Sequence, residues 1–136
     1  MKKFKNVFNI LITTILLGIF CTACDSEQST ITILHTNDTH SQIEPIAAGK
    51  RDGNHAGYAR RMGIILQERA HDPNLLLFDA GDYSQGTPYF NFYHGRVEVD
   101  ALNRMEYDAI TLGNHEFDYG VDTLATILKQ AEFDVV

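Results

Sequence analysis

The sequence contains little cysteine: two residues in 136, Cys21 and Cys24, both near the N-terminus. Because no cysteine follows Cys24, the rest of the chain cannot form a disulfide framework, and its stability must come from burial and bound metal. The pair also matches a C-x-x-C pattern, but no βαβ pattern surrounds it, which argues against a redox or zinc motif. No internal repeat or low-complexity segment occurs, so a repeat architecture is excluded.

Basic residues are also scarce. The chain has 11 lysines and arginines against 18 acidic residues, a formal net charge of −7, and three of the lysines fall within the first five residues. An acidic chain without a basic stripe argues against binding to a nucleic-acid polymer. If the protein handles phosphate groups, cations must therefore lie between them and its acidic side chains.

A long hydrophobic run occurs only near the N-terminus, at residues 10–20, after the three lysines. This pattern predicts a secretion signal over residues 1–23, too short and wrongly flanked for a stable membrane span. The small residues before Cys24 resemble the lipobox of bacterial lipoproteins, so we expect Cys24 to be acylated and residues 24–30 to form a polar tether. The expected location is the bacterial cell envelope, lipid-anchored, with a secreted or periplasmic protein carrying an ordinary cleaved signal as the alternative.

Beyond the tether, short apolar runs alternate with segments of helical periodicity. The expected strands are residues 31–34, 75–78, 109–112 and 133–136, and the expected helices are 58–70, 97–105 and 121–131, with a loop at 83–95. Strands that alternate with helices predict an α/β fold with a mostly parallel sheet and right-handed crossovers (βαβαβαβ). We expect residues 31–136 to be the incomplete N-terminal portion of a larger domain.

Potential metal ligands follow three of these strands. Asp38 and His40 follow the first, Asp82 the second, and Asn114 and His115 the third. Residues two apart in an extended segment project to the same side, so Asp38 and His40 can bind one ion together. Asp82 can bridge two ions about 3.5–4 Å apart, as in two-metal hydrolases. Mixed oxygen and nitrogen ligands favour Zn, Mn, Mg or Fe.

His115 and Asp118 form a second candidate group. The three-residue spacing allows Asp118 to orient the imidazole of His115 and to favour its charged form. Such an imidazole can stabilise a transferring phosphoryl group or protonate a leaving oxygen. Gly81 and Gly113 precede candidate ligands and allow the backbone to approach the ions closely. Each motif alone could be a simple turn or helix cap, but their occurrence at three successive strand ends favours a metal site.

The motifs also carry a family resemblance. They read His35-Thr36-Asn37-Asp38-Thr39-His40, Asp79-Ala80-Gly81-Asp82 and Leu112-Gly113-Asn114-His115-Glu116-Phe117-Asp118. This series resembles the first three metal motifs of the calcineurin-like metallophosphoesterases, and above all the 5′-nucleotidase family, which includes bacterial UDP-sugar hydrolases and 2′,3′-cyclic phosphodiesterases.

The resemblance implies two divalent ions. Asp38, His40 and Asp82 would hold the first ion, Asp82 and Asn114 the second, and His115 and Asp118 would form the catalytic dyad. Family members take later histidine and glutamine ligands and a nucleoside-binding C-terminal domain, so the resemblance implies a missing C-terminal part or partner chain.

The expected function is metal-dependent hydrolysis of phosphate esters, above all 5′-nucleotides, by metal-activated water. The expected partners are a nucleotide or other phosphate-ester substrate and, through the lipid anchor, a membrane. The alternatives are cyclic-phosphodiester or UDP-sugar hydrolysis, and a catalytically silent metal-binding lipoprotein fragment.

Overall fold

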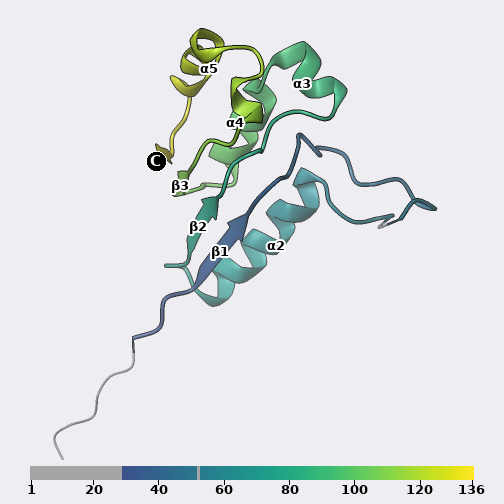
Figure 1. Cartoon of the computed structure of the whole chain (residues 1–136). Helices are drawn as coiled ribbons and strands as arrows, with labels where there is room; N and C mark the ends of the chain where they lie inside the picture. The colour runs from purple at the N-terminus through teal and green to yellow at the C-terminus, as the bar shows by residue number, and fades with distance from the viewer. Residues whose placement is uncertain (1–28, 52) are drawn as a thin grey trace, which may run out of the picture. The chain divides into compact units, whose positions relative to one another are not determined.

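The computed structural model describes residues 29–51 and 53–136, so the expected signal, Cys24 and most of the expected tether lie outside the described residues. The chain divides into two units, residues 1–30 and 31–136, and the second contains every element discussed below (Figure 1). Within the described ranges, no helix is long and apolar enough to cross a membrane.

Four parallel strands form one sheet in chain order, and helices connect them (Figure 1). The strands are β1 (Ile33–Thr36), β2 (Leu76–Asp79), β3 (Ala109–Ile110) and β4 (Asp134–Val135), and the helices are α2 (Tyr58–His71), α3 (Pro88–Tyr93), α4 (Arg96–Arg104) and α5 (Val121–Leu128). A short 3₁₀ helix, η1 (His115–Phe117), follows β3. This arrangement confirms the predicted parallel α/β fold, because each strand returns to the sheet through a helical crossover.

The clearest difference from the sequence-based expectation is α3, which occupies a segment predicted to be a loop. Its helix begins with Pro88, a residue suited to the first helical position, directly after the extended Thr87. The strand β1 lies two residues later than expected, and α5 ends at Leu128, three residues earlier than expected.

One face of the sheet packs against the helices. Leu77 and Ile110 on that face are each 1% exposed and contact buried residues of α2 and α4, including Ile65 and Leu102. Each side chain of this size stabilises the fold by about 1.5–3 kcal/mol when fully buried. The opposite face is more open, and Ile33 on it is 54% exposed. The core therefore lies mainly between the sheet and the helices, and the loops that carry the candidate ligands follow the strand ends.

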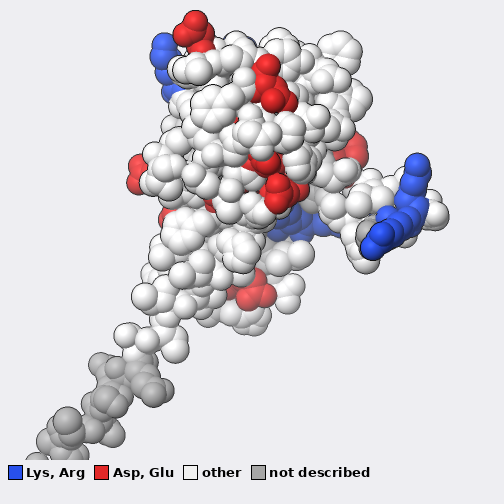
Figure 2. Space-filling view, in the orientation of Figure 1, with Lys and Arg blue, Asp and Glu red and all other residues white. Residues whose placement is uncertain are grey.

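Charged groups are distributed unevenly over the visible surface. In the view of Figure 2, acidic side chains are scattered over the body of the molecule, and basic ones appear in separate places, one of them the projecting loop between β1 and α2. This loop contains the exposed residues Lys50 and Arg51. The distribution agrees with the acidic composition and shows no continuous basic band on this face.

Candidate metal centre

The loops that leave β1 and β2 run side by side and are joined through their backbones. The amide of Asp38 donates to the carbonyl of Gly81 (3.1 Å), and the amide of His40 donates to the carbonyl of Asp82 (3.0 Å). A third bond connects the Ser41 amide to the Tyr83 carbonyl (2.8 Å). These bonds extend the pairing beyond the strands and hold the first two motifs next to each other.

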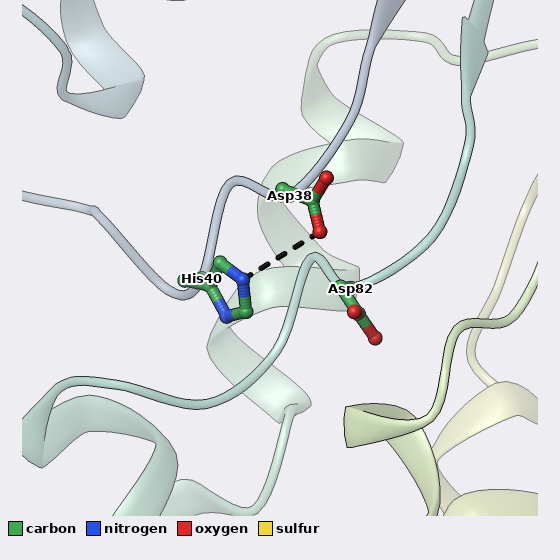
Figure 3. A group of neighbouring side chains, drawn as sticks. All are labelled: Asp38, His40 and Asp82. Atoms are coloured by element: carbon green, nitrogen blue, oxygen red, sulfur yellow. Dashed lines mark ion pairs between the residues drawn. The ribbon is translucent and has the colours of Figure 1, made fainter.

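The side chains of Asp38, His40 and Asp82 lie close together on these loops (Figure 3). Each offers one ligand atom, and these atoms all lie within 4.8 Å of one another. The His40 Nε2 atom is 3.7 Å from Asp38 Oδ1, which Figure 3 marks with a dashed line. Two carboxylates and an imidazole are a donor set suited to divalent first-row metals and magnesium-type ions. The residues present therefore fit a metal ion.

The backbone reaches this arrangement in an unexpected way. The φ angles are 51° at Asp38, 44° at His40 and 52° at Asp82, all in the left-handed region. The expectation that Asp38 and His40 project together from an extended segment is therefore wrong, although their side chains do meet. Aspartate and histidine are among the non-glycine residues that enter this region most readily. The ligand residue types thus also suit the local backbone.

Two glycines allow the β2 and β3 loops to lie back to back. Gly81 has φ of 96°, and a Cβ atom added there would lie 2.6 Å from the amide nitrogen of Gly113. A Cβ atom on Gly113 would lie 2.1 Å from Asp82 Oδ1. The glycines therefore allow close contact between the two loops, whereas the sequence predicted that they allow close approach of the backbone to the ions.

The β3 loop reaches Asp82 through its backbone. The amide of His115 donates to Asp82 Oδ1 (3.0 Å), so the third motif is attached to the aspartate expected to be shared. Asn114 is exposed and lies between Gly113 and His115. Its role as a ligand of a second ion remains a prediction.

His115 and Asp118 meet as the spacing predicted. The two residues are three apart in the sequence, and the one-turn helix η1 brings their side chains together, with His115 Nδ1 3.0 Å from Asp118 Oδ2. This hydrogen bond raises the pKa of His115. The His115 ring also lies beside the ring of His40, with centroids 5.3 Å apart and a 68° angle between the planes. The pair therefore stands at the edge of the ligand cluster.

Glu116 has a role in the site that the sequence pattern did not predict. Glu116 is only 5% exposed, and its carboxylate accepts bonds from the amides of Gly113 (2.7 Å), Asp82 (3.0 Å) and Ser84 (3.0 Å). Its position inside the third motif was the only available signal, because its bonding partners on the β2 loop are more than 30 residues away in sequence.

Asp79, the first residue of the second motif, was also missed as a contributor. It is 3% exposed, and it accepts bonds from the Gly81 amide (2.9 Å) and the Thr36 hydroxyl (2.5 Å). The Thr36 hydroxyl is in turn 2.8 Å from the Tyr107 hydroxyl. Burial raises the pKa of Asp79, and the bonds from Thr36 and Gly81 partly offset this. Asp79 thus supports the turn that presents Asp82.

A parallel α/β sheet whose carboxyl-end loops gather two aspartates and a histidine beside a His–Asp pair has the features of a metal-dependent hydrolase. Residues 31–133 match the family model described as calcineurin-like phosphoesterase. The chain belongs to this family of metallophosphoesterases.

Proteins similar to this chain include several 5′-nucleotidases. The chain is 47% identical over 111 residues to a snake venom 5′-nucleotidase of Naja atra, covering 78% of this chain and 21% of the relative. It is 43% identical over 112 residues to a 5′-nucleotidase of Homo sapiens, covering 78% and 20%. The crystal structure of a 5′-nucleotidase precursor from Thermus thermophilus matches with a TM-score of 0.71 and 44% identity, covering 78% and 21%. The chain therefore spans about a fifth of the length of these relatives.

Proposed function

We propose that this protein hydrolyses phosphate esters of nucleotides, 5′-nucleotides in particular, with the help of two divalent metal ions. The observation that carries the proposal is the convergence of Asp38, His40 and Asp82, whose ligand atoms lie within 4.8 Å of one another. Support for the substrate class comes from the relatives, which are named as 5′-nucleotidases.

The proposed roles divide the site into ligands and reacting groups. Asp38, His40 and Asp82 would hold the first ion, and Asp82 with Asn114 the second. Bound there, the ions would supply an activated water and neutralise charge on the phosphoryl group. His115, kept in position by its hydrogen bond to Asp118, would donate a bond or a proton to the departing oxygen.

The test uses the complete protein, with the C-terminal part that the family resemblance implies, freed of metal with a chelator and then titrated with Mn²⁺, Zn²⁺ or Mg²⁺. Calorimetry measures ion binding, and phosphate release from a nucleoside 5′-monophosphate measures turnover. We expect binding of two ions and metal-dependent release. Preferential cleavage of a 2′,3′-cyclic nucleotide or a UDP-sugar would identify that compound as the substrate in place of a 5′-nucleotide. Ion binding without any hydrolysis would support the silent metal-binding alternative. Absence of ion binding would overturn the proposal.

A second part of the proposal concerns location. We propose that the protein is exported and anchored through a lipid on Cys24, on the strength of the apolar run that precedes this cysteine. Cys24→Ser should move the protein from the membrane fraction to the soluble fraction of the expressing cells, whereas Cys21→Ser should leave it in the membranes. Equal partitioning of both variants and the wild type would favour an ordinary cleaved signal.

A further inference from the structure

Glu116 occupies a buried position between the two loops that carry Asp82 and Asn114, yet it is not one of the clustered ligands. We infer that Glu116 is a positioning residue whose carboxylate holds these loops in their metal-binding arrangement before any ion is bound. The inference rests on the proposed function for its ligands, but the hydrogen bonds that support it belong to the chain alone.

The carboxylate of Glu116 joins the two loops directly. One oxygen, Oε2, accepts bonds from the amides of Gly113 on the β3 loop and Asp82 on the β2 loop. The other oxygen, Oε1, accepts a bond from the amide of Ser84, two residues beyond Asp82. Three amides that would otherwise need separate partners therefore share one side chain.

These bonds also explain why Glu116 supports the site without binding an ion. Both of its oxygens are already used by backbone amides, whereas an oxygen of Asp82 lies within 4.8 Å of the ligand atoms of Asp38 and His40. The β1 loop is itself bonded to the β2 loop, so Glu116 indirectly fixes Asp38 and His40 as well. One carboxylate thus stabilises the relative positions of all three ligand-bearing loops.

A matched residue exists at the other end of the sheet. Asp108 also accepts a bond from a strand amide, with its Oδ2 atom 2.7 Å from the nitrogen of Leu77. It lies before β3, whereas the ligands follow the strands. Asp108→Asn makes the same carboxylate-to-amide change at an acceptor of a backbone N–H without touching the ligand loops. It is therefore a control for that chemical change alone.

The first test measures ion affinity by calorimetry in the full chain. Glu116→Gln keeps the size of the side chain, but its amide NH₂ group must face at least one of the three backbone N–H donors. We expect Mn²⁺ affinity to fall about 10–100-fold, the range typical of residues that orient metal ligands. Asp108→Asn should bind as the wild type does. Equal affinity of Glu116→Gln and the wild type would overturn the inference.

The second test needs no metal and no substrate. Hydrogen exchange of the metal-free chain should show protected amides at Asp82, Ser84 and Gly113, and Glu116→Gln should expose these three selectively. Unchanged protection there would overturn the inference even if affinity fell. Loss of the whole fold in both Glu116→Gln and Glu116→Asp would assign the residue to general stability and also overturn it. A wild type that binds no ion but shows the selective exchange would refute the proposed function alone.

Discussion

The two ends of the sheet are built differently. At the carboxyl end, the connection from β1 to α2 and the loop after β2 are bonded to each other and enclose the buried residues Ser41, Asp79 and Ser84. At the amino end, the chain turns sharply, as where the Leu75 amide donates to the Asp72 carbonyl (3.2 Å). The backbone is accordingly strained at one end and mostly relaxed at the other.

Left-handed backbone conformations make this contrast clear. Among described non-glycine residues with positive φ, only Glu106 lies on the amino side, and the others lie between the end of β1 or β2 and the helix α2 or α4 that follows. Such conformations cost on the order of 1 kcal/mol or more each and persist where surrounding contacts hold them. The carboxyl end therefore gives up stability for geometry, which is the expected property of a binding site.

The largest effect is expected at the carboxyl end of the sheet, when Asp82 is replaced. Asp82→Ala should abolish binding of both ions and nearly all phosphate release, because this carboxylate is proposed to touch both ions and is bonded to the His115 amide. Metal analysis of the purified chain and a phosphate-release assay measure the two effects. The control is Asp100→Ala, which breaks an exposed ion pair with Arg104 on α4 and should leave both unchanged. Retention of both ions by Asp82→Ala would refute the bridging role.

Removing the reacting group should separate binding from chemistry. His115→Ala should keep ion binding largely intact and slow the chemical step about 10²–10⁴-fold, the usual contribution of a positioned acid or base. Single-turnover kinetics with metal content measured in parallel provide the comparison. If ion affinity falls as far as the rate does, His115 acts by supporting the ligands, and the dyad assignment fails.

Two glycines, one in a ligand loop and one in the middle of α2, should differ in how well they tolerate alanine. Gly113→Ala places a Cβ atom 2.1 Å from Asp82 Oδ1, so we expect a loss of about 1–3 kcal/mol and weaker ion binding. Gly63, in the middle of α2, has nothing within 4 Å of an added Cβ atom. Gly63→Ala should therefore stabilise the fold by about 0.5–1 kcal/mol. Urea denaturation of both variants measures the difference, and equal tolerance at the two positions would remove the contrast.

Sequence patterns revealed the layout of the molecule better than its local geometry. The helix α2 was expected at 58–70 and is found at Tyr58–His71, because its apolar stripe is regular and long. The short α3 was missed, since its six residues are too few for a periodic pattern and its only start signal was Pro88. The periodicity of apolar residues therefore predicts long helices but does not detect helices as short as α3.

The candidate site shows the same limit. Asp38, His40 and Asp82 were recognisable because each follows an apolar strand, and parallel strands end at one edge. The role of Glu116 was not recognisable, because it depends on bonds to the amides of Asp82 and Ser84 from another loop. Left-handed conformations at the ligands were equally invisible, since no glycine occupies those positions.

The smallest expected effect concerns Glu98, a buried acid at the start of α4. It is fully buried, and its oxygens have no hydrogen-bond partner in the described part of the chain, although the nearby Ser41 hydroxyl partly lowers its pKa. Burial dominates and raises the pKa of Glu98. Glu98 also acts electrostatically on Tyr58 and Tyr83, and burial raises the pKa of both, so neither tyrosine ionises near neutral pH.

The sign of the effect follows from this shift. A buried acid with a raised pKa favours the folded state below its unfolded pKa of about 4.3, and this contribution is lost as pH rises through the folded-state value. Glu98→Gln cannot ionise, so its stability relative to the wild type should increase with pH across that window, by an amount on the order of 1 kcal/mol. Urea denaturation at pH 4 and pH 8 measures the change. A constant difference between the two chains would mean that Glu98 finds compensation at neutral pH. Glu98 would then not lower the stability of the folded protein, although it lacks the three N–H donors that bind Glu116.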